Sequence, residues 1–344
     1  MTKVRFGIVG MGIGKNQGRA IAQDPRGVVV ALCDLDEGRM HEFAAELPED
    51  VRFYTDYKKL CHDEEVDAVF VGTPNQTHVP IALEAVRAGK HVLVTKPLSD
   101  SVASAQKLVE VAEQAGVVNM MSLSLRFGSD MQYLGRLARA GEFGEIYYAR
   151  ARSVRRSGIP TWGTHFISPG GGAFRDMGVH LLDAAWWMAG CPQPVSVAGV
   201  AGAKFGPRGL GYMEYRDPGP EFVRQFAVDD YGGGMVRFAN GAAIQIESFW
   251  ACHQPDELQI ELFGTEGGAK LSPITLYRIQ NRAPVDATVK LPKRQDGFTT
   301  VAAHFIACVL DGTTCEAPLR HGLIVQRMLE GLLKSAATGK ETRL

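Results

Sequence analysis

The stretch Val4-Arg-Phe-Gly-Ile-Val-Gly-Met-Gly-Ile-Gly-Lys15 decides the fold of the amino-terminal part of this chain. A short apolar run, Val4–Val9, leads into glycines at positions 10, 12 and 14, and a helical pattern follows. Glycines permit a tight strand-to-helix turn, and without side chains their backbone N–H groups can approach a pyrophosphate at the helix N-terminus. The match to GxGxxG is imperfect, because Gly14 falls one residue early and Lys15 takes the third glycine position. A glycine-rich turn without a ligand therefore stays open as an alternative.

An acidic residue ends the second apolar run of the chain. Asp34 follows Val28–Cys33 and lies 24 residues after Gly10. A carboxylate at this place accepts hydrogen bonds from the ribose hydroxyls of NAD and repels the 2′-phosphate of NADP. The pattern predicts NAD, with NADP the less favoured alternative because Arg39 lies nearby. A simple turn carboxylate is the other interpretation of Asp34.

Apolar runs alternate with helical patterns through the first 123 residues. Uninterrupted apolar strands separated by helices are typical of a parallel sheet covered on both faces. We therefore predict a doubly wound α/β domain of the Rossmann type over residues 1–123. The expected strands are Val4–Val9, Val28–Cys33, Ala68–Val71, His91–Val94 and Val117–Met121, and the expected helices are Asn16–Gln23, Arg39–Glu46, Tyr57–Cys61, Val79–Ala88 and Ser101–Ala115.

The pattern changes after residue 124 to strands with period-two alternation. Asn240-Gly241 lies between two of these strands, and this dipeptide is a strong hairpin signal. We predict an α+β domain with a mainly antiparallel open sheet over residues 124–344, and a surface excursion at 202–220. The expected strands are Ile146–Val154, Val195–Val200, Val228–Phe238, Ala242–Trp250, Leu258–Gly264 and Ala269–Ser272, and the expected helices lie at Asp176–Ala189, Thr300–Leu310 and Leu323–Ala337.

One helix of the second half carries a polar stripe on an otherwise apolar segment. Asp176 and His180 are four residues apart, so they share a helix face, and Asp183 and Trp187 continue that face. A polar stripe on a buried helix is costly unless its groups are paired or line a cavity. Two interpretations stay open. His180 is either a core histidine whose ring is hydrogen-bonded, with Asp176 an ordinary carboxylate beside it, or the two residues form an acid–base site.

Composition limits the classes of partner. The 344 residues carry a formal net charge of −1, which argues against nucleic acid or an anionic membrane as the main partner. The initiator Met is followed almost at once by a strand pattern, and no apolar run approaches the roughly 20 residues of a membrane span. The six cysteines show no metal-type spacing, so we expect reduced thiols, a cytoplasmic protein and no metal site.

Two further strand ends carry unusual residues. Gly72-Thr-Pro-Asn-Gln-Thr-His78 follows one strand and Thr95-Lys96-Pro97 follows the next. Ligands of open α/β sheets bind beyond the carboxyl ends of the strands, so both loops should flank a nucleotide. The expected cofactor-binding residues are Gly10, Met11, Gly12, Ile13, Gly14, Asp34, Thr73, Pro74, Asn75, His78, Thr95 and Lys96.

At this point the chain resembles the glucose–fructose oxidoreductase / inositol dehydrogenase (Gfo/Idh/MocA) family over nearly its whole length. The resemblance rests on four motifs and on the ending. They are the segments 72–78, AGKHVLVTKP at 88–97, GGGAFRDMGVH at 170–180, ELFGTEGG at 261–268, His304-Phe305 and SAATGK at 335–340.

The resemblance implies a nicotinamide held at the junction of a Rossmann domain and an open-sheet domain that often forms dimers or tetramers. It also implies that the substrate is a sugar, glycoside or cyclitol, and that Lys96, Asp176 and His180 are catalytic. A neutral imidazole suits removal of a hydroxyl proton at neutral pH, so His180 is the expected base and Asp176 its orienting partner. Lys96 would favour the developing alkoxide. The family usually has Glu where this chain has Thr95, a departure that bears on how Lys96 is held.

Substrate contacts are expected from residues before and on the catalytic helix. Arg126 opens the second domain, and the aromatic-rich loop carries Arg156, Trp162 and His165. An indole face packs against the C–H surface of a sugar, and Arg and His bond hydroxyls. The expected substrate-binding set is Arg126, Arg156, Trp162, His165, Asp176 and His180.

Three functions follow from these expectations. The first is an NAD-dependent dehydrogenase that oxidises a secondary hydroxyl of a sugar, glycoside or cyclitol, or reduces the ketone. The second is a redox-neutral cleavage of glycosides on the same fold, in which NAD is used transiently for oxidation, elimination and reduction. The third is a non-enzymatic nucleotide-binding protein.

Overall fold

The computed structural model describes residues 2–292 and 295–344. The chain forms two compact units, which are described separately below. Unit 1 comprises Met1–Gly128 and Gln295–Leu323, and unit 2 comprises Ser129–Arg294 and Ile324–Leu344. Among the described residues, no helix is long and apolar enough to cross a membrane.

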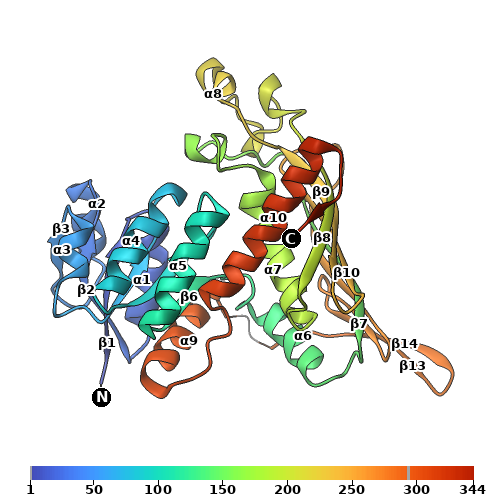
Figure 1. The fold of residues 1–344 in the computed structure, drawn as a ribbon, viewed down its shortest axis with the longest axis horizontal. Coiled ribbons are helices and arrows are strands. Elements are labelled where there is room, and N and C mark those ends of the chain that lie inside the picture. Colours follow the sequence, from blue (N-terminus) through green and yellow to red (C-terminus); the bar gives the residue numbers. More distant parts are fainter. Residues whose placement is uncertain (1, 293–294) are drawn as a thin grey trace. The chain divides into compact units, whose positions relative to one another are not determined.

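Unit 1 is built on a six-stranded sheet in which every pairing is parallel (Figure 1). This arrangement confirms the predicted doubly wound sheet, because successive strands lie side by side on both sides of β1. Its strands, in spatial order, are β3 (Arg52–Tyr54), β2 (Gly27–Cys33), β1 (Val4–Val9), β4 (Ala68–Val71), β5 (His91–Thr95) and β6 (Asn119–Ser122). The central strands β1, β4 and β5 are almost wholly buried, as expected for a sheet covered on both faces.

Helices follow the strands of unit 1 in the expected alternation. They are α1 (Ile13–Gln23), α2 (Glu37–Ala44), α3 (Tyr57–Cys61), α4 (Asn75–Arg87), α5 (Val102–Ala115) and α9 (Gly297–Asp311). Helix α5 begins at the capping side chain of Ser101 and ends at Gly116, whose φ of 66° is the left-handed cap that the sequence indicates. The short strand β3 was not predicted.

Helix α9 packs against α1 and also contacts β1 and β6, although it comes late in the chain. Gln17 of α1 lies fully buried there, and its side chain donates to the carbonyl of Phe298 (3.1 Å). Residues 295–323 are therefore part of unit 1. This differs from the division at residue 124, which placed the whole remainder of the chain in one second domain. Helix α10 (Leu319–Thr338) begins in unit 1 and ends in unit 2.

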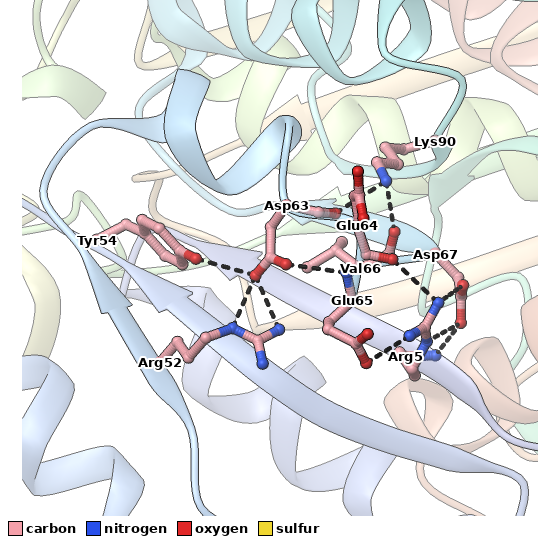
Figure 2. Close-up of polar contacts among 9 residues, drawn as sticks. All are labelled: Arg5, Arg52, Tyr54, Asp63, Glu64, Glu65, Val66, Asp67 and Lys90. Carbon is pink, nitrogen blue, oxygen red and sulfur yellow. Dashed lines mark hydrogen bonds and ion pairs between the residues drawn. The ribbon is translucent and has the colours of Figure 1, made fainter.

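A polar network stabilises the amino ends of the strands in unit 1 (Figure 2). Asp67 accepts from the main-chain N of Arg5 (2.8 Å) and from its guanidinium (2.7 and 3.0 Å), while Lys90 donates to the carbonyls of Asp63 and Val66. Burial alone would raise the pKa of Asp67, but the hydrogen bonds from Arg5 outweigh it and hold that pKa below its usual range. The network supports the edge of the sheet opposite to the glycine turn.

Unit 2 is built on a nine-stranded open sheet that is antiparallel except between β10 and β7 (Figure 1). In spatial order its strands are β14 (Ala283–Thr288), β13 (Thr275–Gln280), β12 (Gly268–Lys270), β11 (Glu257–Gly264), β7 (Ile146–Val154), β10 (Ala243–Phe249), β9 (Tyr231–Phe238), β8 (Pro194–Gly202) and β15 (Thr342–Arg343). The Asn240-Gly241 turn joins β9 to β10 as predicted, and the predicted mainly antiparallel sheet is confirmed.

Helix α7 (Val179–Met188) packs on this sheet through β7, β10 and β11, and α6 (Ser129–Arg139) packs on α7. The approach of α6 to α7 depends on Gly135, where an added Cβ would lie 2.3 Å from the ring of Trp187. The remaining short elements are η1 (Thr164–Phe166), η2 (Phe174–Gly178), η3 (Gly206–Arg208), η4 (Met213–Tyr215) and α8 (Pro220–Arg224).

The segment 202–220 is more than the surface excursion that its composition suggests. Tyr212 is fully buried in a cluster with Trp250 and Met177, and its hydroxyl donates to the carbonyl of Gly206 (3.0 Å). The buried carboxylate of Asp230 accepts main-chain N–H groups from the same segment, at 2.7 to 3.0 Å. The segment therefore packs against the core beside η2.

Candidate functional site

The glycine turn after β1 contains two kinds of glycine. Gly10 has a φ of 92°, and an added Cβ would lie 2.7 Å from the carbonyl oxygen of Gly72. Gly14 is also packed, with Ile8 at 2.9 Å from such a Cβ. Gly12 is different, because its Cβ would meet nothing within 4 Å. Two glycines thus serve the packing of the turn, while the space beside Gly12 is open.

Helix α1 begins at Gly12 without a side-chain cap, and its first turn contains no acidic residue. The first N–H groups of a helix lack intrahelical partners and carry partial positive charge, so an uncapped N-terminus favours an anion. Helix α1 has 11 residues, long enough for a substantial dipole. The glycine turn and the uncapped N-terminus of α1 therefore fit the pyrophosphate of a dinucleotide.

Asp34 lies at the end of β2, where it contacts the glycine turn directly. Its Oδ2 accepts the N–H of Met11 (2.6 Å), and its Oδ1 accepts the N–H of Asp36 (3.1 Å). Arg39 adds a bond from its guanidinium to the carbonyl of Met11 (3.1 Å). The carboxylate is half-buried, so it orders the turn and keeps lone pairs for a further donor.

The loops after β4 and β5 carry the other expected cofactor residues. Thr73 and Asn75 are half-buried, Pro74 is exposed, and Asn75 begins helix α4. Thr95 ends β5 with 8% of its surface exposed, and Lys96 follows it half-buried, joined to Pro97 by a cis peptide bond. These residues lie at the carboxyl ends of β4, which pairs with β1, and of β5, which pairs with β4, and this is the edge predicted for the nucleotide.

His78 is placed differently from the expectation. It is completely buried, with Nε2 at 2.7 Å from the carbonyl oxygen of Thr73 and Nδ1 at 2.8 Å from that of Pro97. Burial lowers the pKa of His78, and the neutral ring donates its one N–H to one of these two carbonyls. His78 therefore links the two loops to each other, and we treat it as a positioning residue and not as a direct cofactor ligand.

Arg126 is also placed differently. Its side chain is completely buried within unit 1, where the guanidinium donates to the carbonyl of Glu316 and to Nδ1 of His321 (3.1 Å). The guanidinium thus binds the segment before α10. We assign Arg126 to the packing of unit 1 and leave it out of the substrate set.

Burial, with the charge of Arg126, lowers the pKa of His321 to about 4. An unfolded histidine takes up its proton near pH 6.5, whereas this folded one stays neutral until near its own pKa. The unfolded state then binds more protons, so the free energy of unfolding falls as the pH falls from about 6.5 towards 4. We expect His321 alone to cost about 1 kcal/mol between pH 7 and 5.5.

The measurement is denaturant unfolding at both pH values. The variant His321→Asn keeps an acceptor for Arg126 but does not titrate, so its loss of stability should be smaller by about that amount. An unchanged difference between the two pH values in the variant would contradict the assignment.

In unit 2, Asp176 and His180 lie across a change of helix type. Residues Phe174–Gly178 form a π-helical turn, and α7 starts at Val179. The sequence predicts a single α-helix here, so the π turn is a correction. Such turns insert one residue into a helix and are frequent at functional sites. Both side chains are half-buried, whereas Asp183 on the same predicted stripe is completely buried.

A half-buried carboxylate, which could not be identified from the sequence, holds the start of this helical segment. Asp229 accepts the N–H of Phe174 (2.9 Å), and its carbonyl accepts the N–H of Ala173 (3.0 Å). Burial raises the pKa of Asp229, while the bond from Phe174 opposes that rise. Gly172 must be glycine here, because its φ is 103° and a Cβ would lie 2.2 Å from Oδ1 of Asp229.

Trp250 holds the carboxylate of Asp176. The indole is completely buried, and its Nε1 donates to Oδ2 of Asp176 (3.0 Å). Nothing in the sequence near Trp250 indicates this bond, so the role of its N–H could not be predicted. Trp250 is thus a positioning residue for Asp176.

Trp250→Phe keeps a buried ring but removes the hydrogen bond to Asp176, so kcat should fall about tenfold, the size of one lost bond to a charged group. Trp186→Phe is the matched control, since Trp186 is equally buried and donates to the carbonyl of Pro192 (2.8 Å). Steady-state kinetics and thermal unfolding separate the two effects. Equal losses of kcat in both variants would reject the positioning role.

The expected substrate loop is exposed in this structure. Trp162 is 61% exposed and meets Phe166 edge to face, while the ring of His165 lies 4.2 Å from that of Phe166. Arg156 is exposed, and its main chain and side chain bind Asp256 (2.7 Å) and the carbonyl of Gln254 (3.3 Å). Two of these three side chains thus gather at one aromatic cluster on η1, and Arg156 lies apart from it.

Comparison with known proteins gives two family matches along the chain. Residues 4–123 match the model described as oxidoreductase family, NAD-binding Rossmann fold, and residues 131–270 match the GFO/IDH/MocA C-terminal domain.

Curated relatives cover nearly the whole chain. D-glucoside 3-dehydrogenase of Escherichia coli (strain K12) is 28% identical over 321 residues, 92% of this chain and 90% of that protein. The scyllo-inositol 2-dehydrogenase (NAD(+)) of Bacillus subtilis (strain 168) is 24% identical over 319 residues, 91% and 88% of the two chains. Among solved structures, levoglucosan dehydrogenase in complex with NADH and L-sorbose superimposes with a TM-score of 0.85 at 21% identity, covering 100% and 99%. This likeness shows the shared fold.

Proposed function

The chain belongs to the GFO/IDH/MocA family of NAD-binding oxidoreductases, and from this premise we propose that it oxidises a secondary hydroxyl of a sugar, glycoside or cyclitol, or reduces the corresponding ketone. The observation that carries the proposal is the placement of Asp176. Its half-buried carboxylate is held by Trp250 on the helical segment that also presents His180. The names of the relatives, a glucoside and an inositol dehydrogenase, support the substrate class.

We assign the chemistry to three side chains that act together on the substrate carbinol. His180 accepts the hydroxyl proton, and Asp176 orients the imidazole and stabilises its charged form. The ammonium group of Lys96 stabilises the negative charge that develops on the oxygen. NAD, when bound, accepts the hydride from the same carbon. In the reverse direction His180 returns the proton to the reduced ketone.

The cofactor is proposed to lie along the carboxyl edge of the parallel sheet. The turn at Gly10–Gly14 and the N-terminus of α1 would hold the pyrophosphate, and Asp34 the adenosine ribose. Thr73, Pro74 and Asn75 after β4, with Thr95 and Lys96 after β5, would flank the nicotinamide half. We therefore propose that residues 1–123 bind the cofactor and that the groups which bind the substrate come from residues 124–344.

The choice of NAD over NADP rests on the charge of Asp34. Asp34→Asn keeps an oxygen that can accept the N–H of Met11, so the turn should stay ordered while the repulsion of a 2′-phosphate is lost. We expect the preference for NAD over NADP to fall about tenfold. The measurement is the ratio of kcat/KM for the two cofactors.

Asp36→Asn is the matched control for that ratio. Asp36 is an exposed carboxylate two residues further on, and it caps α2 by accepting the N–H of Arg39 (3.2 Å). It should leave the cofactor preference unchanged. An equal change in both variants would show that local charge in general, and not a ribose contact, sets the preference.

Substrate contacts are proposed for Trp162 and His165, with Arg156 in a peripheral role. The exposed indole of Trp162 offers an apolar face for the C–H surface of a pyranose or cyclitol ring, and His165 offers a ring nitrogen for a hydroxyl.

We also propose that copies of the chain associate as a dimer or tetramer through the open sheet of unit 2. Exposed apolar side chains on its strands support this, namely Tyr147, Val195, Val200, Leu258, Tyr277 and Ile279. A cytoplasmic location remains part of the same proposal.

The test is the near-ultraviolet absorbance of reduced nicotinamide, recorded with NAD over a panel of inositols, aldoses and glycosides. Net NADH formation with one substrate class supports the dehydrogenase. No change in absorbance, together with release of free aglycone from a glycoside, would replace the dehydrogenase proposal by redox-neutral cleavage. This alternative stays open because Thr95 stands where the family usually has Glu. NAD binding without turnover of any compound in the panel would favour a non-enzymatic nucleotide-binding protein.

A further inference from the structure

A cluster of three potential metal ligands lies in unit 1, and none of the three is among the residues assigned to cofactor or substrate. His304 and Cys308 are one helical turn apart on α9, and Cys315 comes from the loop between α9 and α10. Their ligand atoms all lie within 4.8 Å of one another. No metal site was expected from the sequence, because the spacing of these residues matches no common motif. In the structure, the turn after Gly312 brings Cys315 to the other two residues.

The observed distances are close to those of a tetrahedral metal site. Zn²⁺ bonds of about 2.3 Å to sulfur and about 2.0 Å to nitrogen place a ligand sulfur roughly 3.5 Å from a ligand nitrogen and about 3.8 Å from a second sulfur. The Sγ of Cys308 lies 3.5 Å from Nε2 of His304. All three ligand atoms lie within 4.8 Å of one another, a limit about 1 Å longer than the tetrahedral edge, so binding would require the side chains to move by at most about that distance.

The hydrogen bonds around the cluster suit metal binding. The N–H of Glu316 donates to Nε2 of His304 (2.9 Å), so the neutral ring carries its proton on Nδ1. This is the tautomer that presents the Nε2 lone pair, which a bound ion would take over from Glu316. The thiol of Cys315 donates to the carbonyl of Asn119 (3.8 Å), a bond that is given up when the thiol loses its proton to a bound ion. The ring of Phe127 packs against His304 at 5.2 Å and limits its orientation.

Access is compatible with binding from solvent. Cys308 is 5% exposed, while His304 and Cys315 are half-buried. Two thiols and an imidazole form a soft ligand set, which selects thiophilic ions such as Zn²⁺ over Mg²⁺ or Ca²⁺. The six cysteines are all free thiols, so both sulfurs are available.

We propose that His304, Cys308 and Cys315 bind one thiophilic metal ion, with Zn²⁺ as the representative. Binding releases the two thiol protons to solvent and leaves a fourth coordination position for water. The ion would tie the end of α9 to the loop that carries Glu316, whose carbonyl accepts from the buried Arg126. Its role is structural, since none of the three ligands belongs to the proposed catalytic set.

The experiment is a titration of the full-length protein with Co²⁺ alone and then with Zn²⁺ as competitor. The protein is first reduced with a phosphine and freed of metal with a chelator, and its six thiols are counted. We expect one equivalent of Co²⁺ to give the sulfur-to-metal charge-transfer band of thiolate coordination, and Zn²⁺ to displace it with a Kd below about 1 μM.

Three cysteine variants decide the assignment. Cys308→Ser and Cys315→Ser should each weaken Zn²⁺ binding at least about tenfold, the range for loss of a metal-site group. Cys252→Ser, a half-buried cysteine of unit 2, should bind as the unaltered protein does. A missing charge-transfer band in the unaltered protein, or Zn²⁺ binding in Cys308→Ser as tight as in the unaltered protein, would overturn the proposal.

A second measurement on the unaltered protein covers the case in which the serine variants do not fold. Zn²⁺ should slow alkylation of Cys308 and Cys315 at least about tenfold, because a metal-bound thiolate is a poor nucleophile. The rate at Cys252 should not change. Equal rates at Cys308 and Cys315 with and without Zn²⁺ would reject the site.

Discussion

Lys96→Ala should lower turnover at least about a hundredfold while leaving NAD binding largely intact, and His180→Ala should do the same. The ammonium group stabilises charge that is present in the transition state and absent in the neutral alcohol, so its loss falls on kcat more than on binding. Loss of His180 removes the proton acceptor, a role that typically contributes about 10²- to 10⁴-fold. The measurements are kcat on the substrate identified in the panel and NAD affinity by titration.

A second lysine serves as the control that distinguishes a catalytic role of Lys96 from the general effect of removing one positive charge. Lys107 is exposed on α5 and has no assigned role, so Lys107→Ala should retain full activity. Lys96→Arg keeps the positive charge but not the compact ammonium group, and it should recover only part of the loss. An active Lys96→Ala enzyme would reject the mechanism. An active His180→Ala enzyme would leave Lys96 as the acid–base group.

Much of unit 1 could be predicted because its signals are local. The apolar runs of β1, β4 and β5 are buried on both faces, so each stays apolar along its whole length. The glycine turn and the left-handed cap at Gly116 require particular backbone angles that few other residues adopt. The Asn240-Gly241 hairpin of unit 2 was predictable for the same reason.

Contacts between distant residues could not be read from the sequence. The bond from Trp250 to Asp176 spans 74 residues, and nothing near either residue indicates it. Helix α9 belongs to unit 1 through packing on α1, where Gln17 and Phe298 are 281 residues apart, and position in the sequence does not indicate such a contact. The carboxylate of Asp229, which accepts the N–H of Phe174 at the start of the π turn, likewise comes from a loop 55 residues away in the sequence.

The surroundings of single side chains could not be predicted from a strand-end position or from a family resemblance. Histidine and arginine both bind ligands often, but His78 and Arg126 are completely buried here and contact main-chain carbonyls. Buried polar side chains must be satisfied, and loops offer unpaired carbonyls that such side chains can satisfy. The cluster of His304, Cys308 and Cys315 shows the converse, since irregular spacing concealed a compact group.

Gly12→Ala should weaken NAD binding at least about tenfold, a larger effect than its effect on the stability of the protein. A Cβ at Gly12 would meet no atom within 4 Å, although the backbone angles there, φ −78° and ψ −104°, lie outside the regions that alanine prefers and should cost some stability. A loss of NAD affinity beyond that loss of stability would come from the space beside Gly12, where the pyrophosphate is proposed to approach the backbone. The measurements are NAD affinity by titration and the midpoint of thermal unfolding without cofactor.

Gly10→Ala gives the contrasting result. Its Cβ would lie 2.7 Å from the carbonyl oxygen of Gly72 at a φ of 92°, so this variant should lose stability with or without NAD. The pair thus separates a glycine required by packing from one required by the ligand. If Gly12→Ala binds NAD as tightly as the unaltered protein, the pyrophosphate does not lie at this turn, and the open N-terminus of α1 must be reassigned.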